Sequence, residues 1–398
     1  MNALEQYRYD YSVAKLFATL LFIHSSNNSI KHIFPYLSSS ISTAISIVCS
    51  VIFIFMFLHE HKSFKPSLYI KIIILETVFC FLYAISILRY PIAEKEIIGR
   101  AIWTLVFCVP MFCLVLQMKN LDMFFSKPVK IAVYALAAEG FLIFYITLFG
   151  GIETKMQYNM SFGYMLLFPI LFLFTESKGS KINFLLAISL TIGITILASR
   201  GPLLFIALYI LICYLFDNNS SRKIILLVLV FLGGIVFYHF GESLLQEVSA
   251  FFETIGIYSR TLDKMLMGMD ALENLSDRDI IWEITKNNIW EKPCWGWGIA
   301  GELSYMNSYP HSIILEILLH YGIFGGSIAL LIIFFSIIKS LFITKFRNHV
   351  LLIFLFSGFG HLFLSGTYLI EYKFWILFGI CFSIMKKRPY LLYKRNEL

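Results

Sequence analysis

The sequence predicts an all-α polytopic integral membrane protein with about 12 transmembrane helices and one long polar loop. Hydrophobic residues make up 59% of the 398 residues, charged residues make up only 14%, and the mean hydropathy is +0.77. Soluble domains carry about a quarter charged residues, so this composition excludes that class. The apolar runs are continuous, whereas the strands of an outer-membrane barrel alternate apolar and polar residues. Helices are therefore expected, because they satisfy their own backbone hydrogen bonds in lipid.

Apolar runs long enough to cross a bilayer follow one another along the chain. The first, sixth and eighth are short enough for one of them to be re-entrant. The N-terminal segment lacks a basic region followed by a small-residue cleavage site, so we expect no removable signal peptide. The runs are approximately Tyr11–His24, Leu37–Leu58, Leu68–Leu88, Ile97–Leu116, Val129–Phe149, Ser161–Phe174, Ile182–Ala198, Pro202–Phe216, Ile224–Phe240, Ser312–Ile338, His349–Leu364 and Phe374–Met385.

Lysine and arginine are concentrated in every second connection between these runs. Such connections face the cytoplasm in inner-membrane proteins, so both termini are predicted to be cytoplasmic. The predicted organisation is residues 1–240 with helices 1–9, an external loop over 241–311 containing short helices, and residues 312–398 with helices 10–12 and a cytoplasmic tail. The basic connections carry Lys62 and Lys65; Lys119, Lys127 and Lys130; Lys178 and Lys181; Arg222 and Lys223; and Lys339, Lys345 and Arg347.

The net charge of +7 follows from this topology. The segment Gly241–Pro310 has eleven acidic and five basic residues, a net charge of −6, which leaves +13 for the rest of the chain. The basic excess therefore meets anionic membrane lipid at the cytoplasmic face, and nothing favours nucleic-acid binding. Six of the seven cysteines lie in apolar runs, so no disulfide framework is indicated. No metal-binding, Walker A or dinucleotide motif occurs, so we expect no metal, no cofactor and no ATPase activity.

A first candidate site residue is Arg200, in the tight turn Ser199-Arg200-Gly201-Pro202 between two apolar helices. An arginine beside a helix N-terminus can bind an anion, since the free N–H groups and the helix dipole attract negative charge. The alternative is a guanidinium that reaches the lipid headgroups or pairs with a carboxylate.

A second candidate is the helix that begins near Ser276 or Asp277 and that Pro293 stops. It carries Arg278 and Trp282 and has an apolar face, so we expect it to lie along the membrane interface. Arg278 is an anion-binding candidate, and its alternative role is an ion pair with Glu283.

The turn Pro293-Cys294-Trp295-Gly296-Trp297-Gly298 follows directly. Glycines expose the backbone there, and Trp295 and Trp297 offer flat faces on which a sugar ring can stack. The alternative is a tryptophan belt at the membrane interface, which is common in membrane proteins.

His311 opens the next apolar run and is a candidate base. Ser312, Glu316 and His320 fall on one helix face at i, i+4 and i+8. A lone histidine is more often a satisfied polar residue, but this one lies on the side predicted to hold Arg200 and Arg278. Glycines from Gly322 onward interrupt the run, so an interfacial part followed by a true span is expected.

These motifs resemble the conserved region of the O-antigen ligase/polymerase family over roughly residues 160–335. That family has arginine on a helical hairpin turn, as at Arg200, and usually has asparagine after the histidine, where this chain has Ser312. The matching motifs are Arg278-x-x-x-Trp282, Pro293-x-x-Gly296-x-Gly298, and His311-Ser312 running into Glu316 and Gly322-x-x-Gly325.

The resemblance implies a GT-C-type glycosyltransferase of the bacterial inner membrane that needs no metal. Its donor would be a glycan on undecaprenyl diphosphate, and its acceptor a glycan hydroxyl at the periplasmic face. Arg200 and Arg278 would bind the diphosphate, with Arg260 as a further candidate. His311 would deprotonate or orient the acceptor hydroxyl, and Glu316 would orient His311 or hold the acceptor.

Two activities known in this family fit these motifs. The stretch Tyr158–Pro169 favours a polymerase of O-antigen or capsule repeat units, and the alternative is a ligase that transfers the polysaccharide to lipid A–core. A polysaccharide flippase is a further alternative from another class, but the chain shows no inverted repeat or matched broken helices. A chain-length regulator is a further candidate partner.

Overall fold

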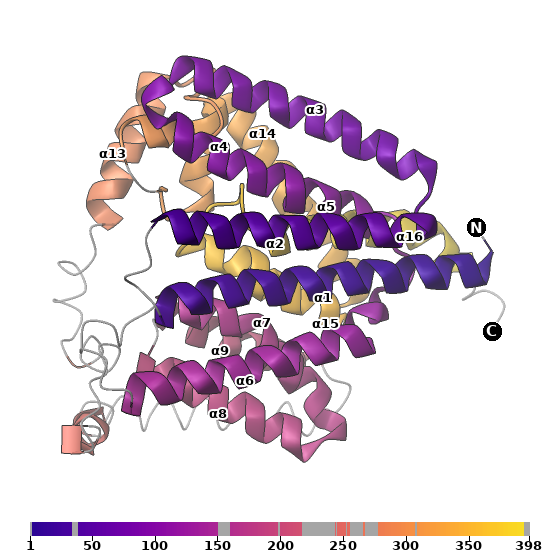
Figure 1. Cartoon of the computed structure of the whole chain (residues 1–398), viewed down its shortest axis with the longest axis vertical. Helices are drawn as coiled ribbons and strands as arrows, with labels where there is room; N and C mark the ends of the chain where they lie inside the picture. Colours follow the sequence, from indigo (N-terminus) through magenta and orange to yellow (C-terminus); the bar gives the residue numbers. More distant parts are fainter. Residues whose placement is uncertain are drawn as a thin grey trace. The chain divides into compact units, whose positions relative to one another are not determined.

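The structure is a computed structural model of the chain. It describes residues 2–33, 39–149, 160–197, 200–216, 278–306 and 309–393, together with positions 243, 245–251, 253–254 and 266. Within these residues all regular secondary structure is helical (Figure 1). Each predicted apolar run in this part of the chain coincides with one or more helices, which confirms those predictions. The predicted run Ile224–Phe240 lies outside the described residues.

The chain folds as two compact units. The first, unit 1, comprises Met1–Leu20, Ser50–Val129 and Asp277–Leu398, so it joins segments from both ends of the sequence. Its helices are α1 (Ala3–Ile33) up to Leu20, α2 (Ser39–His59) from Ser50, η1 (Glu60–Ser63), α3 (Pro66–Arg89), η2 (Pro91–Ala93), α4 (Glu94–Trp103), η3 (Thr104–Cys108), α5 (Val109–Val115), η4 (Leu121–Phe125), α13 (Arg278–Glu291), η7 (Gly301–Ser304), α14 (Ile313–Thr344), α15 (His349–Phe354), η8 (Leu355–Phe359), η9 (Gly360–Phe363) and α16 (Tyr372–Tyr393).

Unit 2 comprises Leu21–Cys49 and Lys130–Ser276. Inside it, α7 packs against both α8 and α9. Lys130 forms an ion pair with Glu176, and the Tyr134 hydroxyl donates to Asn183 Oδ1 at 2.8 Å. Its main helices are α6 (Lys127–Phe149) from Lys130, α7 (Met160–Glu176), α8 (Lys181–Leu197) and α9 (Arg200–Leu215).

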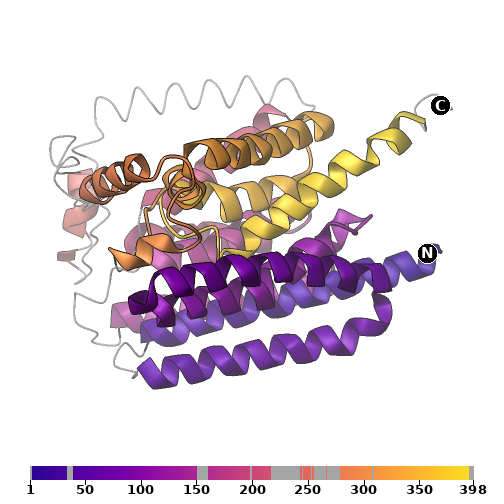
Figure 2. The ribbon, with the colours of Figure 1, turned by 90° about the horizontal axis from the view of Figure 1, so that it is seen from above.

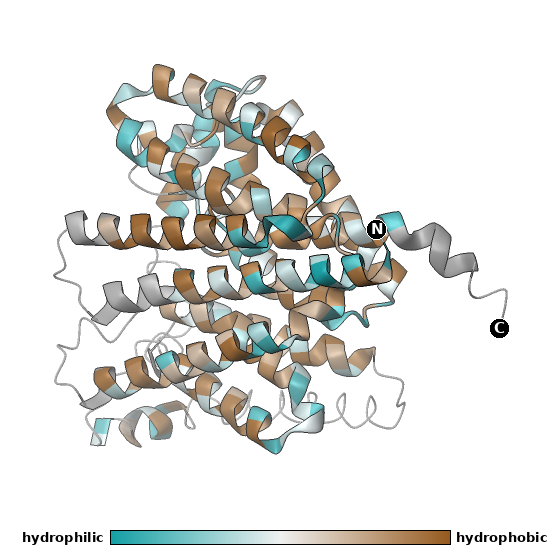
Figure 3. Ribbon diagram, turned by 45° about the vertical axis from the view of Figure 1, so that its right-hand side comes forward, coloured by the Kyte–Doolittle hydropathy of each residue, from teal (hydrophilic) through white to brown (hydrophobic). Residues whose placement is uncertain are grey.

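Several helices have the length and composition of membrane spans. Among the described residues, four are long and apolar enough: Pro66–Arg89, Pro91–Val115, Leu121–Ile146 and Ile313–Thr344. Hydrophobic residues dominate these helices in Figure 3. The membrane class predicted from composition is thus supported, and the number of about 12 spans stays a prediction.

The core of unit 1 lies where α16 packs against α5 and α14, and the orange α14 and yellow α16 lie next to each other in Figure 2. The segment η3 is a π-helix that precedes Pro110. Proline lacks an N–H, and its ring crowds the carbonyl four residues earlier, so the α-helical pattern widens there. The π-helix begins at Thr104, whose hydroxyl lies 2.7 Å from the Tyr83 hydroxyl and donates to the Leu369 carbonyl at 2.8 Å.

Candidate active site

The turn after α13 docks into a break in α14. Gly322 has φ 72° and ψ 178°, which interrupts the helix, as the sequence predicted for this glycine. An unbroken helix would bond the Ile323 N–H to the Leu319 carbonyl. Instead, the Ile323 N–H donates to the Pro293 carbonyl at 2.7 Å, and the freed Leu319 carbonyl accepts from the Trp297 N–H at 2.8 Å. The broken helix thus keeps its hydrogen bonds by pairing with the turn.

Two glycines make this docking possible. A Cβ on Gly296 would lie 2.5 Å from the Gly322 nitrogen, and a Cβ on Gly322 would lie 2.6 Å from the Pro293 carbonyl oxygen. Contacts under 3.0 Å with backbone atoms force a shift, so neither position accepts a side chain without moving the chain. Both residues also have positive φ, which disfavours any other residue type.

The two tryptophans of the turn have different environments. Trp297 is half-buried: its ring stacks on Tyr90 with centroids 6.1 Å apart, its Nε1–H donates to the Asn288 carbonyl at 2.8 Å, and the Lys292 ammonium lies 3.4 Å from its ring centroid. Trp295, by contrast, is 89% exposed. Trp297 therefore anchors the turn, while the ring of Trp295 is exposed.

His311 lies directly before α14 in a left-handed backbone conformation, φ 55°. Its ring packs on Tyr309 with centroids 4.4 Å apart, and its buried Nδ1 has no hydrogen-bond partner among the described residues. Burial and the nearby charge of Arg278 lower the pKa of His311 to about 4. Its imidazole is therefore neutral at physiological pH and can accept a proton.

Helix α13 brings Arg278 and Trp282 to the same place as His311. The two residues lie four positions apart, hence on one face of α13. The Trp282 Nε1–H donates at 3.0 Å to the carbonyl of Pro310, the residue just before His311. The charge of Arg278 also contributes to the lowered pKa of His311, after burial. A cation, a neutral base and an aromatic surface thus converge at the start of α14.

A largely buried ion-pair cluster contacts this turn. Glu302 pairs with Arg100 of α4 and accepts from His320 Nε2 at 2.7 Å, while His320 Nδ1 lies 2.9 Å from the Tyr368 hydroxyl. Glu316 bonds to the Thr367 hydroxyl and to the Tyr368 N–H at 3.4 Å. Burial would raise the pKa of Glu302, but His320 and Arg100 outweigh it and lower that pKa below its usual range, so the carboxylate is ionised.

The ligand atoms of Glu302, Glu316 and His320 lie within 4.8 Å of one another, close enough for a metal ion to bridge. Each carboxylate nevertheless bonds to protein donors at both oxygens, and both His320 ring nitrogens have partners. The cluster is therefore a satisfied polar network that ties α4, η7, α14 and the loop before α16 together.

The match to a known family covers the same residues. Residues 182–330 match the family model described as O-antigen ligase, and this range contains Arg200, Arg278 and His311. This match supports the resemblance of this part of the chain to the O-antigen ligase/polymerase family. Its members are membrane-bound enzymes that transfer glycans. None of the curated proteins matches the chain.

Within the matched residues, the structure links Arg278 and Trp282 of α13 to His311, while Trp297 packs on Tyr90 instead, all in unit 1. Arg200 is the first residue of α9 in unit 2, and its side chain, like the whole of Arg260, lies outside the described residues. Glu316 is buried against Thr367 and Tyr368, and no bond from it to His311 occurs among the described residues. The roles predicted for these residues stay predictions.

Sequence reasoning missed Arg100, Glu302 and Tyr368, although they carry the buried cluster next to the family motifs. Arg100 and Glu302 are 202 positions apart, so no local spacing links them. The one available signal was the charge of Arg100. Arginines within apolar spans are rare and are usually paired, so its position called for a partner. The loop before α16 also contacts the segment that precedes α14, since the Tyr309 hydroxyl lies 3.2 Å from the Ser365 hydroxyl.

Proposed function

We propose that the protein is a polysaccharide polymerase of the GT-C type, which elongates O-antigen or capsule repeat units at the periplasmic face of the bacterial inner membrane. The observation that carries this proposal is that a Trp282–Pro310 hydrogen bond fastens the helix of Arg278 to the residue before His311, whose half-buried imidazole is neutral. Glycan transfer from undecaprenyl diphosphate needs a proton acceptor for the attacking hydroxyl and a cation for the departing diphosphate. His311 and Arg278 supply these two groups.

In the proposed reaction, an acceptor hydroxyl attacks the anomeric carbon of the donor glycan. The new C–O bond forms as the bond to the diphosphate breaks, the electron pair leaves with the diphosphate, and the hydroxyl proton passes to His311. Arg278 binds the departing anion, with Arg200 as the second guanidinium and Arg260 as a further candidate. Planar guanidinium groups suit this task because they bind phosphate oxygens in pairs. Each such donor stabilises developing charge by about 3–4 kcal/mol.

Other residues would bind the sugars. Trp295, with its exposed ring, is suited to stack on a sugar face, whereas Trp297 supports the turn from behind. Trp282 holds the carbonyl of Pro310 and so sets the position of His311 relative to α13. Glu316 would act indirectly, by fixing the loop before α16 through its bonds to Thr367 and Tyr368.

A ligase is the second candidate, because the matching family model is described as O-antigen ligase. Both enzymes use the same donor and differ in the acceptor. A ligase transfers the polysaccharide to lipid A–core, whereas a polymerase transfers it to another lipid-linked repeat unit. A chain-length regulator would be a partner of the polymerase alone.

The test is a reconstituted assay with the purified full chain. With undecaprenyl-diphosphate-linked repeat unit as both donor and acceptor, a polymerase yields a ladder of longer glycans without ATP and in the presence of EDTA. To test for a ligase, lipid A–core replaces the repeat unit as the acceptor, and the expected product is glycan attached to lipid A–core. No product from either acceptor, or a requirement for metal, would contradict the proposal.

Variants test the residue assignment in the same assay. Arg278→Ala and His311→Ala should reduce the initial rate at least about a hundredfold, the loss typical of a removed charge-stabilising donor. Lys286→Ala is the matched control, because Lys286 is an exposed cation on the same helix. Normal ladders from Arg278→Ala would remove Arg278 from the site.

A further inference from the structure

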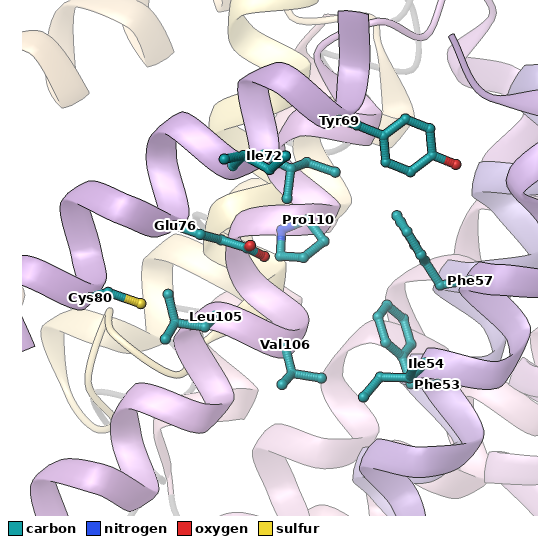
Figure 4. A pocket seen from close by; sticks show the side chains of 11 residues that line it. Phe53, Ile54, Phe57, Tyr69, Ile72, Glu76, Cys80, Leu105, Val106 and Pro110 are labelled. Atoms are coloured by element: carbon teal, nitrogen blue, oxygen red, sulfur yellow. The ribbon is translucent and has the colours of Figure 1, made fainter. Parts of the chain in front are cut away.

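A pocket of about 440 Å³ lies among α2, α3 and the η3–α5 segment of unit 1, away from the family motifs. Figure 4 shows aromatic and aliphatic side chains from all three segments around it, with the Glu76 carboxyl among them. Phe57 and Tyr69 line one end and Cys80 the other. The lining is thus almost entirely apolar.

The pocket is continuous with the outer surface of these helices. Two of its lining residues, Ile54 of α2 and Ile73 of α3, are 44% and 61% exposed. Only 17% of the most apolar window of α3 is buried inside the protein, so most of this predicted span faces the bilayer. An apolar recess that opens onto lipid is filled by hydrocarbon, because water gains no hydrogen bonds there.

The length of the pocket matches one leaflet. Tyr69 and Cys80 are eleven residues apart on α3, which at the helical rise corresponds to about 16 Å. One leaflet of a bilayer contributes about 15 Å of hydrocarbon. The pocket therefore accommodates one extended acyl chain of the leaflet from which it opens.

The Tyr69 end of the pocket adjoins a basic turn. The Tyr69 hydroxyl donates to the His61 carbonyl at 3.4 Å, so the pocket and η1 are in contact. This turn carries the exposed side chains of Lys62 and Lys65. Its one carboxylate, Glu60, is buried and already paired with Lys15 at 3.0 Å. The charge at this end of the pocket is positive and complements an anionic headgroup.

We propose that this pocket binds an acyl chain of an anionic phospholipid, with the headgroup phosphate on Lys62 and Lys65. Glu76 lies about 10 Å farther along α3 than Tyr69, beside the middle of the chain. The site is independent of the proposed glycan transfer.

The experiment is native mass spectrometry of the purified full chain titrated with phosphatidylglycerol or phosphatidylcholine of identical chains. We expect one phosphatidylglycerol to bind about tenfold more tightly than phosphatidylcholine, since two lysines meet its phosphate without an opposing choline. The double variant Lys62→Gln/Lys65→Gln should remove this preference, whereas Lys178→Gln/Lys181→Gln should keep it. Equal binding of the two lipids by the unmodified protein would overturn the proposal.

Filling the pocket tests the acyl-chain part separately. Val106→Trp places a large ring inside the pocket, and Ile54→Trp blocks it from the exposed side, so each should weaken phosphatidylglycerol binding about tenfold. Val78→Trp is the matched control, since Val78 is 48% exposed on α3 outside the pocket lining. Unchanged binding by Ile54→Trp would overturn the proposal, as would displacement of phosphatidylglycerol by an equimolar polyprenyl phosphate.

Discussion

The imidazole of His311 is subject to two influences that both oppose its protonation. Burial removes water from the charged form, and Arg278 repels it. An unperturbed histidine would be partly protonated near pH 6.5, whereas His311, with its pKa lowered to about 4, stays neutral down to about pH 5. At the residue scale, burial and the arginine therefore keep the imidazole neutral over a wider pH range, and they also make it a weaker base than an unperturbed histidine.

This predicts the pH dependence of the site. Slow exchange of the imidazole C2–H, followed by mass spectrometry, should report a His311 pKa near 4, and the transfer rate should fall only as pH drops toward that value. In Arg278→Gln the repulsion is lost, so the pKa of His311 should rise, and Arg278→Lys should leave it unchanged. A midpoint near 6.5 in both the unmodified protein and Arg278→Gln would contradict this account.

At the scale of elements, the break in α14 and the turn after α13 are one structure. The break in α14 leaves backbone N–H and C=O groups without helical partners, and the turn supplies the hydrogen bonds to them. Two further contacts stabilise this junction: Trp297 stacks on Tyr90, and Glu302 pairs with Arg100 and His320. This locks the start of α14, and hence His311, against α13.

The glycines at this junction give a stability prediction. Gly322→Ala should lower the free energy of unfolding by about 1–3 kcal/mol, because a Cβ there meets backbone oxygens and the positive φ is strained. Gly325→Ala is the control three residues away, where the nearest contact is an ordinary 3.4 Å. Thermal unfolding in detergent should show a lower midpoint for the first variant only. Equal midpoints would mean that the junction is not tightly interlocked.

At the scale of the whole molecule, the two units carry different parts of the predicted site. Unit 1 holds Arg278 and His311, and unit 2 holds Arg200 at the start of α9. The predicted topology requires both to reach the external side of the membrane. This side assignment comes from the distribution of lysine and arginine alone.

Labelling of cysteines tests this topology. Cys294 is an exposed free thiol in the turn after α13, so a variant keeping it as its single cysteine should react with a membrane-impermeant maleimide from outside intact inner membranes. A single cysteine placed at Lys62, in the basic turn η1, should react only after the membrane is opened. The reverse pattern would invert the predicted orientation.

Much of this architecture could be predicted from sequence because it depends on local patterns. The long apolar runs predicted the helices, Pro293 predicted the end of α13, and Gly322 predicted the interruption of α14. The motif around Arg278 and His311 predicted the family that the domain match over residues 182–330 supports. Each of these follows from residues close together in the chain, where backbone geometry and hydrophobicity act directly.

Only the tertiary structure decided which distant residues meet. Glu302, which gave no signal in its loop, is ionised and buried because Arg100 and His320 surround it. Glu316, which the resemblance suggested would orient His311 or hold the acceptor, bonds to Thr367 in a loop 51 positions away. Buried charges need partners wherever the chain supplies them, and one-dimensional spacing does not contain that information.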